Sequence, residues 1–250
     1  MKAFSNLLTN LILTSSRNRK ILLLVEYFSS TPDPDRGYAL AALTGSLKFK
    51  NIKAAFFKEL VREKQDEYLF ALSYDYVGDL AETVSLLWDK KNDGEIPSLS
   101  TLFDSLEKVK SEDLKRNIID ILDNSNADQR WAFIKLFTGG LRIGVSSRLV
   151  KQALSEYGNV DLNEIEKIWH GLALPYINLF SWLEKRDKKP KISSYDIFHP
   201  MMLAHPLIVE KDLTTANPKN FIAEYKWDGI RVQIVSYSEG CRLYSRTGDE

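Results

Sequence analysis

Residues 224–235, EYKWDGIRVQIV, decide how the rest of this 250-residue chain is interpreted. Within them a lysine, one spacer residue, an Asp-Gly pair and an arginine stand between two apolar runs. Residues 221–225 and 231–237 are rich in apolar, β-branched and aromatic side chains, which predicts two short strands. Ser-Glu-Gly at 238–240 predicts a hairpin turn, and residues 241–245 predict the returning strand. The lysine is therefore expected at the end of a strand, just before an antiparallel hairpin.

The residues around Lys226 suit nucleophilic attack on a phosphate. A lysine amine attacks only when it is unprotonated, and exposed lysines have a pKa near ~10.4. Partial burial beside Trp227 and a neighbouring cation such as Arg231 are expected to favour the neutral amine. Asp228 is placed to orient the lysine, and Gly229 lets the backbone approach a nucleotide where a Cβ would collide.

Two further residues of this segment suit nucleotide contacts. Glu224 lies two residues before Lys226, so a strand would place both side chains on one face, where Glu224 reaches an adenine or ribose. Arg231 suits contact with ribose, phosphate or a DNA terminus. Taken alone, the Lys-x-Asp-Gly string also fits a hairpin with an exposed lysine and a turn-forming Asp-Gly pair.

A second segment favours the nucleophilic lysine over the ordinary hairpin. Residues 245–250, SRTGDE, begin nineteen residues after Lys226, on the returning strand. Together the two segments resemble the adenylation motif and the following Ser-Arg-x-Gly motif of ATP-dependent DNA ligases. The resemblance implies that Lys226 is the nucleophile that becomes adenylated, and that Arg246 contacts the bound nucleotide. The simpler alternative for Arg246 is a turn-region arginine in a surface ion pair.

Upstream of these motifs, to about residue 187, apolar residues recur at spacings of three and four, which is typical of amphipathic helices. The clearest stripes are Phe4, Leu7, Leu8, Leu11 and Ile12; Ile52, Phe56, Leu60 and Val61; Leu80, Val84, Leu87 and Trp88; Leu114, Ile118, Ile121 and Leu122. Gly37, Gly45, Gly78 and Gly94 fall between stripes, as helix ends or tight approaches require. The pattern predicts a bundle of ten to twelve short helices.

Residues 137–154, FTGGLRIGVSSRLVKQAL, predict a helix, a glycine break, a short extended piece and a new helix that opens at Ser146 or Ser147. The glycines Gly140 and Gly144 and the fresh helix N-terminus would expose backbone N–H groups. Together with Arg142, these groups make a site for phosphate oxygens. No residue here is suited to distinguish bases, so binding independent of DNA sequence is expected.

This segment is similar to the signature of the N-terminal DNA-binding domain of ATP-dependent DNA ligases. The resemblance implies that Gly140, Arg142, Gly144, Ser146 and Ser147 pack on the duplex backbone near a nick. The alternative is a plain pair of helices in which glycine ends the first and serine caps the second.

The residue pattern changes from helical to strand-like after residues 185–191, KRDKKPK. These charged residues predict a surface linker. We therefore expect a multidomain chain with an all-α helical DNA-binding domain over residues 1–190. Residues 191–250 are expected to form the beginning of an α+β antiparallel nucleotidyl-transferase domain, of the ATP-grasp-like ligase type. They are too few to bury a core of that kind, so we expect a truncated piece of a longer protein.

Composition limits the function classes only weakly. The 34 basic and 34 acidic side chains balance, so the case for nucleic acid rests on the motifs and not on net charge. The single cysteine, Cys241, excludes an internal disulfide and a four-cysteine zinc site. Polar residues interrupt the N-terminal apolar run, and no run approaches the ~20 residues of a membrane span. We expect a cytoplasmic monomer that does not bind membranes.

The resemblance implies a three-domain enzyme whose third part is an OB domain, and an activity that uses ATP and Mg²⁺ to seal nicked duplex DNA in replication, repair or recombination. The metal-binding carboxylate, the adenine-stacking aromatic residue, the late lysines and the OB domain of that family would lie beyond Glu250. We therefore expect no metal ligands in this chain. By itself the chain is expected neither to ligate DNA nor to adenylate itself.

Other functions remain open on the sequence. RNA ligases and capping enzymes share the Lys-x-Asp-Gly core, but they do not usually carry a helical domain with a Gly-Gly-Leu-Arg-Ile-Gly segment. NAD-dependent ligases have a different N-terminal extension and a four-cysteine zinc site. A non-catalytic fragment that clamps duplex DNA through its helices is the alternative from another class.

Overall fold

The computed structural model describes residues 1–49, 52–89, 91–92, 96–138, 140–193, 198–199, 206–215, 217–222, 224–238, 240–246, 248 and 250. Its helices are α1 (Lys2–Leu13), α2 (Arg17–Ser30), α3 (Asp35–Leu43), α4 (Ala54–Arg62), α5 (Glu67–Val77), α6 (Leu80–Leu87), α7 (Leu99–Lys108), α8 (Ser111–Asn124), α9 (Ala127–Lys135), α10 (Ser147–Gly158), α11 (Leu162–Ile168), η1 (Trp169–Gly171), α12 (Ile177–Leu183), α13 (Val209–Thr215) and η3 (Pro218–Asn220). The strands are β1 (Val232–Tyr237) and β2 (Gly240–Ser245). The predicted ten to twelve short helices are confirmed, because twelve α-helices lie between Lys2 and Leu183 in the described residues.

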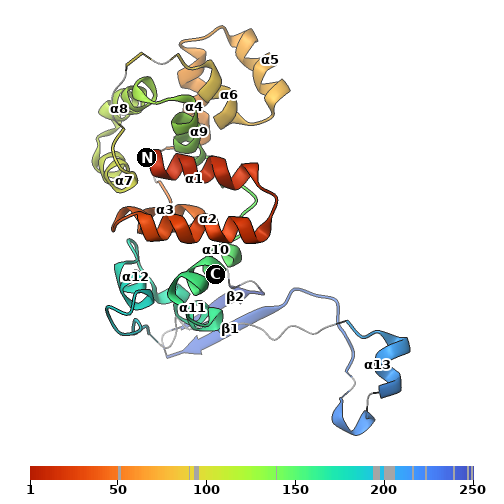
Figure 1. Cartoon of the computed structure of the whole chain (residues 1–250). Helices are drawn as coiled ribbons and strands as arrows, with labels where there is room; N and C mark the ends of the chain where they lie inside the picture. Colours follow the sequence, from red (N-terminus) through yellow and green to blue (C-terminus); the bar gives the residue numbers. More distant parts are fainter. Residues whose placement is uncertain are drawn as a thin grey trace. The chain divides into compact units, whose positions relative to one another are not determined.

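The chain divides into two compact units, which are described separately (Figure 1). The helical unit comprises residues 1–162 and 173–190. The hairpin unit comprises residues 163–172 and 191–250, so the short helical segment from Asn163 to Leu172 groups with the later part of the chain.

The predicted helical stripes form the core of the helical unit. In α1, Phe4, Leu7, Leu8 and Leu11 are buried, and this helix packs on α2 and α9. The prediction was wrong for Ile12, whose side chain is 48% exposed. A residue directly after Leu11 is rotated by about 100° around the helix axis, which turns Ile12 out of the buried stripe.

A second correction concerns α4, where Phe57 is buried and the predicted Phe56 is only half-buried. The ring of Phe57 lies 5.4 Å from that of Phe137, and Phe133 lies 5.1 Å from Phe137, measured between ring centroids. These aromatic contacts fix the end of α9. They therefore anchor the point at which the chain leaves α9 for the glycine-containing segment.

The glycines predicted between stripes serve two purposes. Gly45 and Gly78 follow α3 and α5 with φ values of 75° and 73°, a conformation that glycine adopts without strain. Gly37 lies inside α3, where a Cβ would meet the carbonyl oxygen of Pro175 at 1.7 Å, so it allows a tight approach. Gly94 lies outside the described residues.

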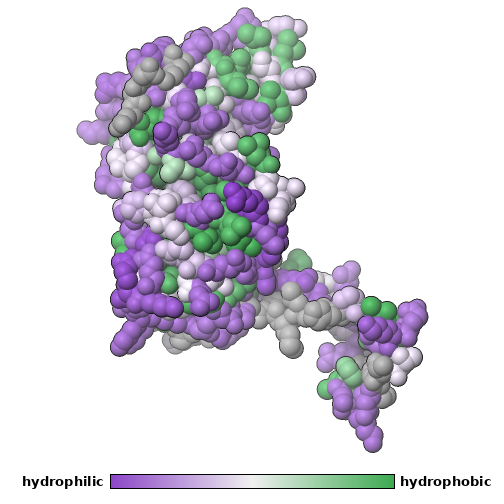
Figure 2. Space-filling model, in the orientation of Figure 1, coloured by the Kyte–Doolittle hydropathy of each residue, from purple (hydrophilic) through white to green (hydrophobic). Residues whose placement is uncertain are grey.

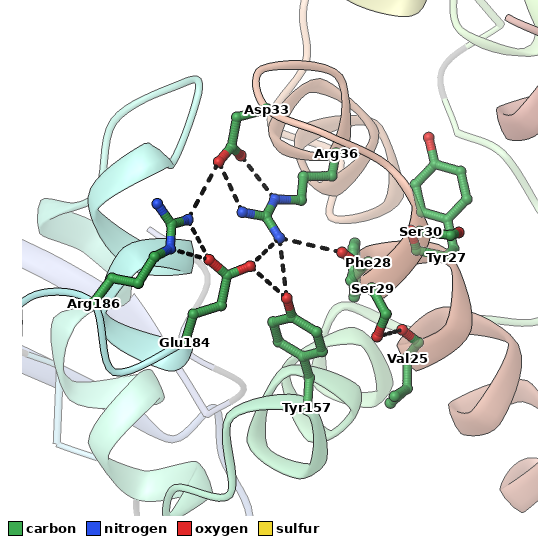
Figure 3. Close-up of polar contacts among 10 residues, drawn as sticks. All are labelled: Val25, Tyr27, Phe28, Ser29, Ser30, Asp33, Arg36, Tyr157, Glu184 and Arg186. Carbon is green, nitrogen blue, oxygen red and sulfur yellow. Dashed lines mark hydrogen bonds and ion pairs between the residues drawn. The ribbon is translucent and has the colours of Figure 1, made fainter.

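A network of charged groups joins α3, α10 and the end of α12 around the buried Arg36 (Figure 3). Its guanidinium donates two hydrogen bonds to Asp33, of 2.8 and 2.7 Å, and others to Glu184 and the Tyr157 hydroxyl. Arg186 binds the second carboxylate oxygen of Glu184 at 2.6 Å. The residues of this network come from three separate places in the sequence, so the network fixes the packing of three helices.

Electrostatics in this network shift the ionisation of both central partners. Hydrogen bonds, above all from Arg36 and then from Tyr157 and Arg186, lower the pKa of Glu184 to about 2, although partial burial opposes this. Burial by itself would lower the pKa of Arg36, but the carboxylates of Asp33 and Glu184 raise it overall.

In the hairpin unit, β1 and β2 pair antiparallel, with Val232 opposite Ser245 and Tyr237 opposite Gly240. The hairpin predicted over residues 231–245 is confirmed. The strand predicted over residues 221–225 is wrong, because its described residues have no strand conformation and are exposed. A strand needs a paired neighbour, and in the described residues only β1 and β2 pair.

The face shown in Figure 2 is largely hydrophilic, with an apolar area over α5, where Leu69 and Leu72 are about half exposed. None of the helices in the described ranges combines the length and apolarity that a bilayer crossing needs.

We predict that Glu184→Gln lowers the free energy of unfolding by about 1–2 kcal/mol at neutral pH, because it removes a charged partner of Arg36. The pKa of Glu184 is lower in the folded chain than the 4.5 of a free glutamate, so its contribution is complete above that pH. The contribution disappears as the pH falls toward about 2. Urea unfolding between pH 2 and 8 measures this.

Glu63→Gln is the control for this experiment, because Glu63 forms an exposed ion pair with Lys115. It should change stability by less than about 0.5 kcal/mol at any pH. A Glu184→Gln effect as small as that of the control would show that the network does not contribute to stability.

Candidate functional site

The glycine loop, defined here as residues 140–146, connects the turn after α9 to the start of α10. The predicted new helix is confirmed: α10 begins at Ser147, and the Ser146 hydroxyl caps it by accepting from the Leu149 N–H at 3.2 Å. Gly140, Arg142 and Gly144 have φ values of 146°, 51° and 66°. Positive φ is strained for a non-glycine residue, so the surrounding structure must hold Arg142 in this conformation.

Side chains alternate along the loop. Leu141 and Ile143 are buried, with 9% and 3% exposure, whereas Arg142 between them is exposed. The two apolar side chains anchor the loop in the core of the helical unit. The guanidinium of Arg142 is thereby held at the surface on a rigid support.

The loop also presents unused backbone donors. The N–H groups of residues 144–148 donate no hydrogen bond to any acceptor in the described part of the chain. They are the residues that lead into and open α10, where the helix dipole favours negative charge. A run of accessible N–H groups beside an arginine is suited to oxygen atoms of a phosphate backbone.

Basic residues line hollows near both ends of the loop. One hollow, of about 200 Å³, is lined by Lys58, Lys135 and Arg142 together with neutral residues and Asp79. Asp79 pairs with Lys135 and offsets its charge. Burial alone would raise the pKa of Asp79, but the hydrogen bond from Lys135 and those from backbone amides lower it overall. The carboxylate is thus held ionised by its neighbours.

The other hollow, of about 510 Å³, lies at the start of α10 and includes Arg17, Lys20 and Ser146 in its lining. No sequence pattern singles out Lys20 or Lys58, because an isolated lysine on a helix looks like a solvated surface residue. The structure places both lysines beside residues of the predicted segment.

The other predicted site residues lie in the hairpin unit and, unlike the glycine loop, are not anchored by buried neighbours. Every described residue from Glu224 to Arg231 is exposed, and none of them lies in a helix or strand. Trp227 is 82% exposed, so the expected partial burial of Lys226 beside it is wrong for this structure. The physical reason is the missing strand over residues 221–225. Without that strand, no neighbouring backbone covers the lysine side chain.

The hairpin does bring together two of the residues that are predicted to contact a nucleotide. Arg231 directly precedes β1 and Arg246 directly follows β2, and Val232 pairs with Ser245. Both arginines therefore lie at the open end of the hairpin, where adjacent like charges repel unless an anion is bound. Lys226 and Glu224 lie upstream of this end, and the described structure does not gather the four residues into a pocket.

A small aromatic cluster supports this end of the hairpin. Tyr244 is fully buried, with its ring centroid 4.5 Å from that of His170 and 5.7 Å from that of Phe198. Gly248, with φ of 84°, packs so closely that a Cβ would lie 3.0 Å from the Phe198 ring. The described residues contain no group of three or more His, Cys, Asp or Glu side chains placed to hold a metal ion.

Sequence comparison relates both parts of the chain to DNA ligases. Residues 1–155 match the family model for the DNA ligase N terminus, and residues 201–250 match that for the ATP dependent DNA ligase domain. The chain belongs to the ATP-dependent DNA ligase family.

Two curated relatives illustrate the relationship. The chain is 26% identical over 257 residues to a "Probable DNA ligase" of Koribacter versatilis (strain Ellin345), covering 95% of this chain and 43% of that protein. It is 24% identical over 255 residues to a "DNA ligase" of Nitrosopumilus maritimus (strain SCM1), covering 90% of this chain and 42% of that protein. The chain thus spans about two fifths of the length of these relatives.

We predict that Gly248→Ala destabilises the hairpin unit by about 1–2 kcal/mol, because alanine is strained at this φ and its Cβ crowds Phe198. Faster hydrogen exchange of the β1 and β2 amides would report this loss. Gly229→Ala is the matched control, since a Cβ there meets nothing within 4 Å. Equal exchange in the two variants would contradict the packing role of Gly248.

Proposed function

We propose that this chain is the N-terminal part of an ATP-dependent DNA ligase, in which Lys226 carries AMP during the sealing of nicks in duplex DNA. The observation that supports this most directly is that Lys226-x-Asp228-Gly229 lies shortly before β1 and Ser245-Arg246 lies at the end of the paired strand β2, in a chain of this family. Neither segment alone distinguishes a nucleotidyl transferase from an ordinary hairpin.

The proposed reaction has three steps. The unprotonated Nζ of Lys226 attacks the α-phosphorus of ATP, the bond to pyrophosphate breaks, and the amine loses a proton. An oxygen of the 5′-phosphate at the nick then attacks the same phosphorus, and the bond to Nζ breaks. Finally the 3′-hydroxyl attacks the 5′-phosphate, which joins the strand and releases AMP.

The residues around the nucleophile have supporting roles in this proposal. Arg231 and Arg246 bind ribose or phosphate oxygens at the open end of the hairpin, and Glu224 contacts the adenine or ribose. Mg²⁺ neutralises phosphate charge in transfers of this kind. Its ligands are not assigned to the described residues, among which no three or more His, Cys, Asp or Glu side chains are grouped to hold a metal ion.

DNA contact is assigned to the helical unit. The N–H groups of residues 144–148 and the guanidinium of Arg142 bind phosphate oxygens of the duplex, while Ser146 and Ser147 open the helix that presents them. Gly140 and Gly144 allow the backbone path. Contacts of this kind carry no sequence information and weaken with salt.

A second function is supported by one observation on the chain by itself. Lys226 and its neighbours are exposed, whereas the glycine loop is anchored by buried side chains. A lysine nucleophile needs a desolvated setting. The isolated chain is therefore suited to binding duplex DNA without catalysis, and activity requires further protein surface around the hairpin.

We predict that the full reading frame containing this chain becomes covalently labelled when it is incubated with α-labelled ATP and Mg²⁺. Lys226→Ala should abolish the label on a denaturing gel, because it removes the attacking amine. Nicked duplex should discharge the label from the wild-type protein. Persistent label on Lys226→Ala would place the nucleophile elsewhere, and no label on either protein would favour DNA binding without catalysis.

For the helical unit, we predict that Arg142→Ala weakens binding of the chain to nicked duplex by about 3–10-fold near 0.1 M salt, through loss of one phosphate contact. The slope of log affinity against log salt should fall by about 0.9. Fluorescence anisotropy over a salt series measures both quantities. Arg116→Ala is the control, because Arg116 pairs with Asp113 on the surface of α8; equal affinities of the two variants would remove Arg142 from the interface.

A further inference from the structure

The glycine loop rests on a buried cation from a distant helix. Lys20 of α2 is only 8% exposed, and its Nζ donates to the carbonyl oxygens of Ile143 at 3.1 Å and Gly144 at 2.9 Å. No carboxylate in the described part of the chain forms an ion pair with Lys20. Burying an ammonium group against neutral carbonyls is costly, so its position calls for an explanation beyond packing.

Peptide geometry gives these two hydrogen bonds a directional consequence. In a trans peptide the C=O and the following N–H point in opposite directions. Since Lys20 draws the carbonyl oxygens of Ile143 and Gly144 inward, the N–H groups of Gly144 and Val145 are directed away from it. These are two of the N–H groups that have no acceptor in the described residues.

Gly144 is shaped for this contact. A Cβ at that position would meet the Lys20 Nζ at 2.6 Å, and the backbone φ of 66° is one that glycine adopts freely. A side chain at 144 would therefore require the Lys20 ammonium or the loop backbone to shift from this contact. The absence of a Cβ at Gly144 thus leaves room for the Lys20 ammonium group.

We propose that Lys20 is a positioning residue for the phosphate-binding glycine loop. It pre-orders the N–H groups of Gly144 and Val145 toward the DNA backbone and fixes the platform that carries Arg142. Pre-ordering removes an entropic cost from DNA binding, so its loss appears as weaker affinity. This inference rests on the proposed DNA contact of the loop.

The test measures binding of the whole chain to a fluorescein-labelled nicked duplex by anisotropy, with four variants: Lys20→Met, Arg19→Met, Arg142→Ala and the double variant Lys20→Met/Arg142→Ala. Lys20→Met keeps the apolar stem and removes the ammonium. Arg19→Met removes one positive charge from the same helix, at a side chain that is 55% exposed and pairs with Glu26. Comparing the two separates loop contact from general electrostatic attraction.

The expected result is a loss of about 5–20-fold in affinity for Lys20→Met and less than about 2-fold for Arg19→Met. The double variant should lose less than the product of the two single losses, because Arg142 already depends on the platform. Equal effects of Lys20→Met and Arg19→Met would overturn the proposal. Multiplicative losses in the double variant would also overturn it, since Lys20 would then act through its own charge.

The same measurements distinguish a failure of the proposed DNA contact from a failure of the proposed role of Lys20. If Arg142→Ala and Lys20→Met both leave affinity unchanged, the loop does not bind DNA, and the positioning role falls with it. If only Arg142→Ala weakens binding, the DNA contact stands and the role of Lys20 alone is overturned.

A second substitution covers the case in which Lys20→Met does not fold. Gly144→Ala keeps every charge but pushes the loop from Lys20, so affinity should again fall by about 5-fold or more. Gly45→Ala imposes a similar backbone strain, at φ of 75°, and a Cβ there meets nothing within 4 Å. Equal affinities of Gly144→Ala and Gly45→Ala would contradict the proposal.

Discussion

The helical unit depends on one buried guanidinium. Arg36 holds the two oxygens of Asp33, the hydroxyl of Tyr157 and the carboxylate of Glu184, which arrive from separate parts of the chain (Figure 3). An arginine in this position would be destabilising without its partners, and each partner would be misplaced without the arginine. The network therefore ties α10 to α3, and α10 is the helix whose first turn carries the proposed DNA contacts.

Much of the fold was predictable because helix periodicity is a local property. The stripe of Phe4, Leu7, Leu8 and Leu11 follows from spacing alone, and the hairpin follows from its turn residues and β-branched strands. Phe57 was missed in favour of Phe56, because two adjacent aromatic residues fit a helical stripe almost equally well. Only the neighbouring rings of α9 decide which of them turns inward.

The candidate sites were predictable only in part, and their residue roles remain predictions. The glycine loop was recognisable from its glycines and its serine cap. Lys20, in contrast, contacts backbone carbonyls 123 and 124 residues away and leaves no pattern in the sequence. The setting of Lys226 was mispredicted for the opposite reason. A local strand propensity was assigned to residues 221–225, but a strand forms only where another backbone completes its hydrogen bonds.

The two arginines at the open end of the hairpin have a further consequence. Arg231 and Arg246 flank the last pair of the β1–β2 ladder, so their repulsion acts on the same few hydrogen bonds that hold this end closed. An anion between them would reverse that force. Under the proposed function, nucleotide binding and strand pairing would then be thermodynamically linked, and the bound nucleotide would act on the hairpin as a counter-ion as well as a reactant.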